Sequence, residues 1–474
     1  MLKSTSTALA LLAATALTSC AAIGPNFKRP EAPAASGYAM AGDPASSIST
    51  LAPEQRAAGA WWLALGSPQL DTLVRQALKD SPDIALAEAN LRAANAEYQA
   101  RVGDRAIKVD GIANAQRERI NVQSFGLTGF PSPTINLYQL GLSTSYDLDL
   151  FGRKRRASEA AKARAEAEAR RADAAYLTLT ASVSLQAVRI ATLRAQIASV
   201  NVVVDGDQRV IGMIKQAQSA GGAPRSATSI GEAQIAADMA LIPPLERQLA
   251  EARHQLAMLL GKSPAEWSAP DFTIADFKLP SEIPVAIPSE LIHRRPDILA
   301  AEATAHAATA DVGVATANLY PNLSLTASLT QGTIKPEDLF QYNASGWSIA
   351  AGLAAPIFHG GTLRKERDQA VAKADAEMAR YRQTVLRAFV QVSDALSGLG
   401  ADKKALEAQA RAEATARANF DDATRAYQLG AGTVINVLDA GRQLNIAQRG
   451  RVDAEGQNLS DIIELFAATA ADWR

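Results

Sequence analysis

The sequence is poor in the residues that build redox, metal or catalytic centres. It has one cysteine and six methionines in 474 residues, so no disulfide can form within the chain and no soft-metal cluster is visible. The four histidines lack the spacing of a metal site: His254, His293, His306 and His359. We find no nucleophile–base arrangement and no phosphate-binding loop. The sequence therefore predicts no enzyme, no cofactor and no metal.

The chain also lacks an excess of either charge and has few aromatic residues. Its 48 basic and 49 acidic residues leave a net charge of −1, which argues against a nucleic-acid-binding face. Hydrophobic residues make up 48% of the chain but aromatic residues only 5%, so most of the apolar mass is alanine and leucine. This composition favours long, closely packed helices over a bulky globular core.

Long apolar runs are missing as well. The apolar run from Ala8 to Leu17, preceded by Lys3, is too short to span a bilayer and is typical of an export signal. Beyond it, we expect no apolar stretch as long as a membrane helix. Any other membrane crossing would have to use strands.

The end of the export signal carries the single cysteine of the chain. Leu17-Thr18-Ser19-Cys20 resembles a bacterial lipobox, in which the cysteine becomes the lipidated N-terminus. The alternative is an ordinary signal peptide with an incidental cysteine. Ala21 follows, not the aspartate that retains lipoproteins at the inner membrane. The segment from Gly24 to Pro53 has no apolar period and predicts an extended linker leading away from the anchor. We therefore expect a lipid on Cys20 and a place in the outer membrane of a Gram-negative cell.

An internal duplication is the strongest feature of the sequence. Pro82-Asp83-Ile84 followed by Glu88 recurs, 214 residues later, as Pro296-Asp297-Ile298 followed by Glu302. Each copy runs from a helix through a pair of strands to a very long helical region. Self-similarity at this period implies two structurally equivalent halves.

The strand pairs show as alternation of apolar with small or polar residues. Residues 138–148 alternate in the first copy, and residues 323–330 and 347–353 in the second; a further strand near Val109 to Gln116 is less clear. The pattern fits either a sandwich or a barrel with lipid outside and water inside. In lipid, four strands with open edges cannot stand alone, so an oligomer is required.

Glycine and proline are absent over unusually long segments. None occurs in residues 153–205, a length of about 80 Å if helical. Residues 362–397 and 401–429 form two more such segments. They predict a coiled coil or a helical tube. A dimeric scaffold coiled coil is the alternative for these segments alone, but such a scaffold has no use for the strand pairs.

Taken in order, these residues resemble the outer-membrane efflux protein (TolC-like) family, in particular its NodT-type lipoprotein branch. The similarity covers nearly the whole mature chain. It rests on Gly24-Pro25-Asn26-Phe27 after Cys20, Trp61-Trp62, Leu259-Leu260-Gly261, Arg294-Arg295-Pro296-Asp297-Ile298 and Pro356-Ile357-Phe358 with Gly360-Gly361.

The resemblance implies a mainly α fold with a membrane β-barrel. Each chain would give four strands and a set of tunnel helices to a homotrimer with a twelve-stranded barrel. The expected divisions are a signal peptide (1–19), a lipidated linker (20–60), a first repeat (61–270, strand pair about 107–150, tunnel helices about 153–260) and a second repeat (271–474, strand pair about 321–358, tunnel helices about 362–460, then a C-terminal equatorial segment).

The resemblance also implies a gate at the periplasmic tip, near the turn after Tyr427-Gln428-Leu429-Gly430. By position, Asp439 resembles the aperture aspartate, Ile435 an apolar constriction and Arg442 a nearby basic residue. Some relatives have an aspartate where this chain has Asn436 and an arginine where it has Gly432, which weakens the case for a second charged ring.

Two acidic sites have a structural as well as a functional interpretation. Without the resemblance, Asp439 and Arg442 are a modest exposed ion pair three residues apart on a helix. Asp147 and Asp149 fall on the small-residue face of their strand, where they either line the pore or have a structural role.

The function implied is the passive exit duct of a tripartite efflux pump for drugs or other small solutes. Its partners would be a periplasmic adaptor protein, an inner-membrane transporter of the RND type and outer-membrane lipid. The exit duct of a type I protein secretion system is the alternative. The exported compounds and the particular adaptor are not encoded in an interpretable motif.

Overall fold

A computed structural model describes residues 22–31, 37–38, 51–53, 60–126, 129–222, 224–279, 283–285 and 288–469. The predicted signal peptide and Cys20 lie outside the described residues. The chain forms two compact units. Unit 1 comprises residues 1–30, 91–168 and 300–381, and unit 2 comprises residues 31–90, 169–299 and 382–474. Each unit therefore takes segments from both halves of the sequence.

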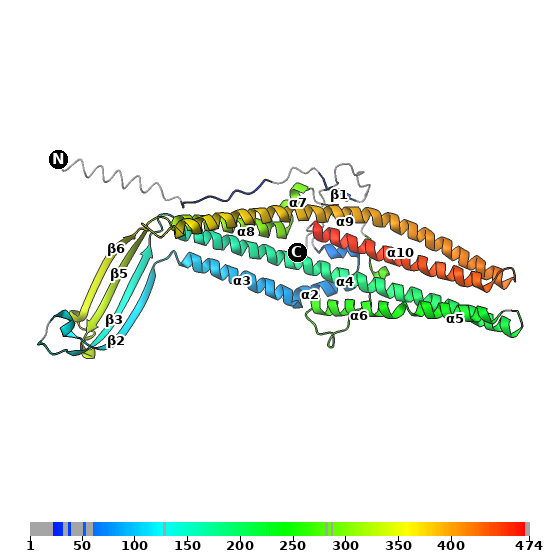
Figure 1. Ribbon diagram of the computed structural model, residues 1–474, viewed down its shortest axis with the longest axis horizontal. Coiled ribbons are helices and arrows are strands. Elements are labelled where there is room, and N and C mark those ends of the chain that lie inside the picture. Colours follow the sequence, from blue (N-terminus) through cyan, green and yellow to red (C-terminus); the bar gives the residue numbers. More distant parts are fainter. Residues whose placement is uncertain are drawn as a thin grey trace. The chain divides into compact units, whose positions relative to one another are not determined.

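Unit 1 contains one antiparallel sheet of four strands (Figure 1). The strands are β2 (Lys108–Arg119), β3 (Thr134–Asp147), β5 (Asn322–Thr333) and β6 (Ser345–Ala354), in the spatial order β2-β3-β5-β6. The strands expected from the alternation are all present. The strand near Val109, for which the alternation is weak, is 12 residues long.

The register of this sheet makes the apolar face continuous. Leu142 lies opposite Leu329, which in turn lies opposite Trp347. Tyr146 likewise faces Leu325, and Leu323 faces Leu353. Directly paired residues point to the same side of a sheet, so the apolar rows of β3, β5 and β6 lie side by side. On these three strands the opposite face carries mainly serine, threonine and glycine.

Three pairs of corresponding elements in the two sequence halves have equal lengths. Helices α3 (Pro82–Gly103) and α8 (Pro296–Ala317) both have 22 residues, and strands β2 and β5 both have 12. Helices α4 (Arg153–Ser219) and α9 (Thr362–Gln428) both have 67 residues. These equal lengths support the duplication that we infer from the sequence.

The long helices continue past the glycines expected to limit them. Helix α4 runs through Gly206 and Gly212, and α9 joins the two predicted segments across Gly398 and Gly400. A glycine costs a helix only about 1 kcal/mol, which packing readily offsets. At position 398 glycine is required by packing, because a Cβ there would collide with the carboxylate of Asp461 on α10 (Val434–Ala468).

One expectation about apolar runs is wrong. Helix α4 contains an 18-residue window with a mean hydropathy of 1.3, enough by length and composition to cross a membrane. The window is 44% buried within the chain. A packed helix rich in alanine, leucine and valine meets the same criterion, so this window is weak support for a membrane helix.

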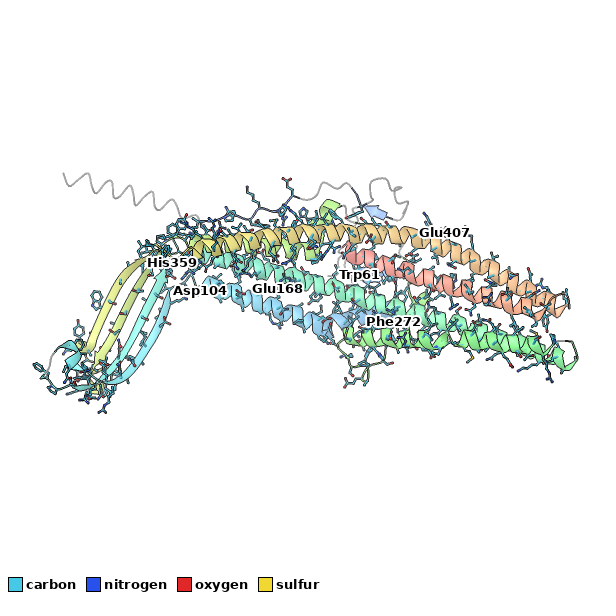
Figure 2. The ribbon with its side chains drawn as sticks, viewed as in Figure 1. Trp61, Asp104, Glu168, Phe272, His359 and Glu407 are labelled. Carbon is cyan, nitrogen blue, oxygen red and sulfur yellow. The ribbon has the colours of Figure 1, made fainter. Side chains whose placement is uncertain are left out.

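Shorter elements complete unit 2. They are η1 (Trp61–Leu65), α2 (Pro68–Asp80), α5 (Arg225–Met239), α6 (Ile242–Leu259), η3 (Ile274–Asp276), α7 (Pro288–Arg294) and a parallel pairing of β1 (Leu51–Pro53) with β4 (Ile283–Val285). Trp61, labelled in Figure 2, is 1% exposed. Its ring stacks on Phe466 of α10 with ring centroids 5.4 Å apart, and its indole N–H donates to the Thr180 hydroxyl of α4. The aromatic residues are thus few but central to this core.

The Arg-Arg-Pro-Asp-Ile signature forms a clamp within unit 2. The buried guanidinium of Arg295 binds both carboxylate oxygens of Asp297, at 3.0 and 2.7 Å. It also donates to the Gln391 side chain on α9, at 2.7 Å, and to the carbonyl of Ala468 at the end of α10, at 2.9 Å. A cation is favourable at a helix C-terminus, so this arginine ties α8, α9 and α10 together.

Candidate functional site

The four-stranded sheet presents an apolar surface that no described residue of the chain covers. Trp347 is 76% exposed and Ile349 is 77% exposed, and Leu329 and Leu353 are also exposed. A soluble protein would bury such a face. The outer edges of β2 and β6 pair with no other strand in the described part of the chain. The apolar face therefore requires an apolar environment, and the two edges require further strands to pair with.

At the end of β3, the two predicted pore aspartates have structural partners. Asp147 forms an ion pair with the Nζ atom of Lys154, at 2.8 Å. The Asp149 carboxylate accepts hydrogen bonds from the backbone N–H groups of Lys154 and Arg155, both at 2.9 Å. Asp149 thus satisfies free N–H groups in the first turn of α4. A pore-lining role for either residue stays a prediction.

The helical hairpins of unit 2 reverse direction through similar turns. After α9, Gly430 has a φ of 75°, its N–H donates to the Tyr427 carbonyl, and the Ala431 N–H donates to the Ala426 carbonyl. After α4, Gly221 (φ 82°) and Gly222 make the equivalent bonds to Gln218 and Ala217. This is the Schellman arrangement, in which a left-handed residue satisfies the last carbonyls of a helix.

The predicted gate residues occupy an exposed stripe on α10. Ile435, Asp439, Arg442 and Ile446 follow the spacing of one helix face, and Ile435 and Ile446 are about half exposed. Arg442 binds Asp439 at 2.9 Å, with 48% and 62% of the two side chains exposed. Within one chain this contact is a modest exposed ion pair, as the structural interpretation of the sequence expects. Asn436, also exposed, lies in the first turn, where its N–H donates to the side chain of the N-cap residue Thr433.

The opposite side of α10 packs into an apolar cluster. Val434, Val437 and Leu438 contact residues from α4 and α5, chiefly Ile211, Ile214 and Ala227. Tyr427 of α9 packs against the same cluster. In this chain Tyr427 therefore holds the turn in place, and any contact with the pore stays a prediction.

Sequence reasoning missed a buried acid pair beside this cluster. Asp207 of α4 is 3% exposed and Asp238 of α5 is 5% exposed. Asp238 accepts hydrogen bonds from Gln234, at 3.0 Å, and from Asn445 of α10, at 3.4 Å. One oxygen of Asp207 has no hydrogen-bond partner. Burial, together with the negative charge of Asp238, raises the pKa of Asp207 to about 6.

A signal for this pair does exist in the sequence. Asp207 falls between Val202-Val203-Val204 and Val210-Ile211, where helical spacing puts it on the face of the apolar residues. Isolated acids in such segments are uncommon inside proteins unless paired. Among the described residues, no group of three or more histidine, cysteine, aspartate or glutamate side chains is placed to hold a metal ion.

Comparison with known proteins decides the family. The model of the outer membrane efflux protein family matches residues 73–262 and 287–471. This chain belongs to that family. Outer membrane protein OprJ of Pseudomonas aeruginosa is 31% identical over 473 residues, which cover 98% of this chain and 95% of that protein. The pyoverdine export outer membrane protein OpmQ of the same organism is 30% identical over 419 residues, 87% of each chain.

Solved structures agree with the family assignment. The outer-membrane channel OprN matches with a TM-score of 0.86 and 28% identity over 95% of this chain and 99% of that one. This member of the efflux family is therefore an outer-membrane channel protein. The family and its relatives are efflux channels, not enzymes.

Proposed function

We propose that three copies of this chain form the exit duct of a tripartite efflux pump. In this proposal the strands close a twelve-stranded barrel in the outer membrane, and the helices form a tunnel that meets a periplasmic adaptor. An inner-membrane transporter of the RND type supplies the energy. Relatives named as solvent and toluene efflux pump outer membrane proteins, each 29% identical to this chain, support the pump assignment.

The sheet is the observation that carries the proposal. Its apolar face is exposed, and β2 and β6 leave their outer edges unpaired within the described residues. In hydrocarbon every backbone N–H and C=O must be satisfied, so an open four-stranded sheet is not stable there. Pairing β2 of one copy with β6 of the next satisfies both edges. A strand of 10 to 14 residues is long enough to cross the membrane at a tilt.

The exposed stripe on α10 is the proposed gate. Threefold symmetry would bring three Asp439 carboxylates around one axis, where their charges repel and attract cations. Arg442, 2.9 Å from Asp439, supplies the compensating charge. Ile435, one turn before Asp439, would form an apolar constriction. Nothing in this device requires a cofactor.

The test of assembly joins neighbouring copies through their strand edges. Ala113→Cys on β2 is combined with Ile349→Cys or Ala351→Cys on β6, and the protein is oxidised in outer-membrane vesicles. We expect at least one combination to give a covalent trimer, because each copy then links to two others. Each single substitution alone is the matched control and should give no trimer. The unsubstituted chain shows whether Cys20 contributes any band.

Two results would contradict the proposal. Ladders that extend beyond three copies would show open rather than closed assembly. Only monomers with every combination, from protein that is folded and membrane-inserted, would show that β2 and β6 do not meet between copies. Either result leaves the family assignment intact but removes the trimeric barrel.

A further inference from the structure

The segment just after Cys20 is held by one buried arginine. Arg156, in the first turn of α4, is 4% exposed. Its guanidinium donates to the carbonyls of Ala22, Ile23 and Gly24, at 3.2 to 3.3 Å, and to the Asn26 side chain, at 2.7 Å. It also pairs with Glu159 at 2.8 Å. A buried guanidinium needs such partners, and the segment supplies four of them.

Three glycines give this segment room. A Cβ on Gly152 would lie 2.5 Å from the Cβ of Ala22, and one on Gly24 would lie 2.5 Å from the Cα of Gly313. A Cβ on Gly313 would lie 2.8 Å from the Arg156 side chain. Real side chains do not approach this closely, so residues 22–24 fit only because all three positions lack a Cβ. We call the space lined by Gly152, Arg156 and Gly313 the N-terminal slot.

Two further contacts fix the segment after the slot. The Phe27 ring stacks on His306 of α8, with centroids 4.8 Å apart and an interplanar angle of 16°. His306 in turn contacts Glu159 at 3.0 Å. Arg29 pairs with the largely buried Glu302 of α8 at 2.7 Å. Contacts therefore hold residues 22–24, Asn26, Phe27 and Arg29, which the expectation of an extended linker did not include.

The N-terminal slot lies beside the connection between the end of β3 and the start of α4. The Ile23 N–H donates to the carbonyl of Phe151, four residues after the end of β3. Cys20 precedes Ala22 by two residues, a reach of about 7 Å in an extended chain. A lipid on Cys20 would therefore emerge near the ends of the strands.

We propose that the N-terminal slot docks the mature N-terminus and sets the depth of the lipid relative to the strands. This inference rests on the proposed function, because it takes Cys20 as lipidated and the strands as membrane-spanning. Its occupant is residues 22–29 of the same chain. The slot makes the acyl chains and the strand ends enter the same membrane surface. A free linker would leave the two uncoupled.

The test follows protease access to the docked segment in the full-length, membrane-inserted protein. Endoproteinase Lys-C cuts after Lys28, which releases the peptide that ends at Lys28 for mass measurement. In Asn26→Ala and Arg156→Gln variants we expect cleavage to be roughly tenfold faster, the change for a loss of about 1.4 kcal/mol of docking free energy. The mass of the lipidated peptide should not change. Asn26 lies on the segment itself, so its replacement leaves the helices and strands intact.

Arg164→Gln is the matched control. Arg164 lies on the same helix and also reaches α8, through an exposed ion pair with Asp311, but it does not touch the segment. Its cleavage rate should equal that of the wild type. Equal rates in all four proteins would overturn the slot. A peptide without lipid, combined with faster cleavage in the two slot variants, would leave the slot standing and remove the lipid anchor from the proposed function.

Discussion

The two helical hairpins of unit 2 have the same type of turn, but the helices that follow the turns differ. Helices α4 and α9 both end in a Schellman turn at a glycine with positive φ. After α9, Thr433 caps α10, which then runs unbroken for 35 residues. After α4, α5 begins at Arg225, and its N-cap residue Pro224 supplies no side-chain cap. It ends after 15 residues, before the Pro243-Pro244 pair in the first turn of α6. The duplicated plan has thus diverged in its returning helices.

The two hairpins also differ in where they place their acidic side chains. The unbroken α10 carries the exposed stripe with Asp439 and Arg442. The interrupted α5 puts Asp238 in its last turn, where a negative charge is unfavourable, and turns it toward the buried Asp207. The α4–α5 hairpin thus buries two acids, whereas Asp439 of the α9–α10 hairpin is exposed. We therefore expect the α4–α5 hairpin to respond to pH more than the α9–α10 hairpin.

The largest expected effect comes from Asp207. Its pKa rises from 3.8 to about 6 in the folded chain, so the folded state keeps a proton that the unfolded state loses. The stabilisation is complete below pH 3.8 and is lost as pH rises through about 6. The full change is roughly 3 kcal/mol. Asp207→Asn should abolish this change, as measured by hydrogen exchange of residues 205–240 between pH 4 and 7, corrected for intrinsic rates.

The matched control for Asp207 is the exposed acid of the other hairpin. Asp439→Asn should leave the pH dependence of exchange in residues 205–240 as it is in the wild type. An Asp207→Asn protein with an unchanged pH profile would show that the buried pair does not control this hairpin. If the exchange rates of residues 205–240 instead change with calcium or sodium concentration at fixed pH, the acid pair binds cations.

A glycine contact should give the next largest effect. A Cβ on Gly231 of α5 would lie 2.8 Å from Ile211 on α4, whereas one on Gly212 of α4 would meet nothing within 4 Å. Gly231→Ala should therefore destabilise the hairpin by about 1–3 kcal/mol, because the two helices must move apart. Gly212→Ala should stabilise α4 by about 0.5–1 kcal/mol. Equal effects of the two substitutions on local hydrogen exchange would refute the close packing of α4 and α5.

Capping should distinguish the hairpins by a smaller amount. Thr433→Ala removes the side chain that accepts from the Asn436 N–H and should cost α10 about 1 kcal/mol. Ser226→Ala, in the exposed first turn of α5, is the control and should be neutral or slightly stabilising. Exchange rates of residues 434–440 provide the measurement. If Thr433→Ala leaves them unchanged, the cap does not hold the start of α10.

The gate pair should affect stability least but conductance most. Asp439→Ala removes an exposed ion pair worth less than about 1 kcal/mol within one chain. Glu232→Ala on α5 removes a comparable exposed pair with Lys215, 2.9 Å apart, and serves as the control. In planar bilayers we expect Asp439→Ala alone to raise the open probability. Identical open probability of the two variants and the wild type would refute the gate assignment.

Much of the fold is legible in the sequence because its signals are local. Alternation at residues 138–148 and 323–330 locates β3 and β5, and the first of the glycine-free segments begins at the start of α4. The Arg-Arg-Pro-Asp-Ile signature is recognisable too. Its use of Arg295 to hold the end of α10 is not, because Ala468 lies 173 residues away.

The remainder depends on contacts between distant segments. Glycines 206, 212, 398 and 400 look like helix breaks, yet packing carries both helices through them. The acid pair of Asp207 and Asp238 requires knowing that α4 and α5 face each other. The slot around Arg156 depends on Gly24, Gly152 and Gly313 meeting in space. The exposed gate stripe is predictable as a helix face, but a single chain does not contain the pore it would line.

Dye accumulation in cells that lack this gene tests the efflux assignment most directly. Cells with the gene deleted and cells with a wild-type copy restored would be loaded with ethidium. We expect deletion to raise dye retention and the wild-type copy to reverse it. Unchanged retention, together with loss of a secreted protein from the medium, would contradict the efflux assignment and identify the chain as a secretion duct.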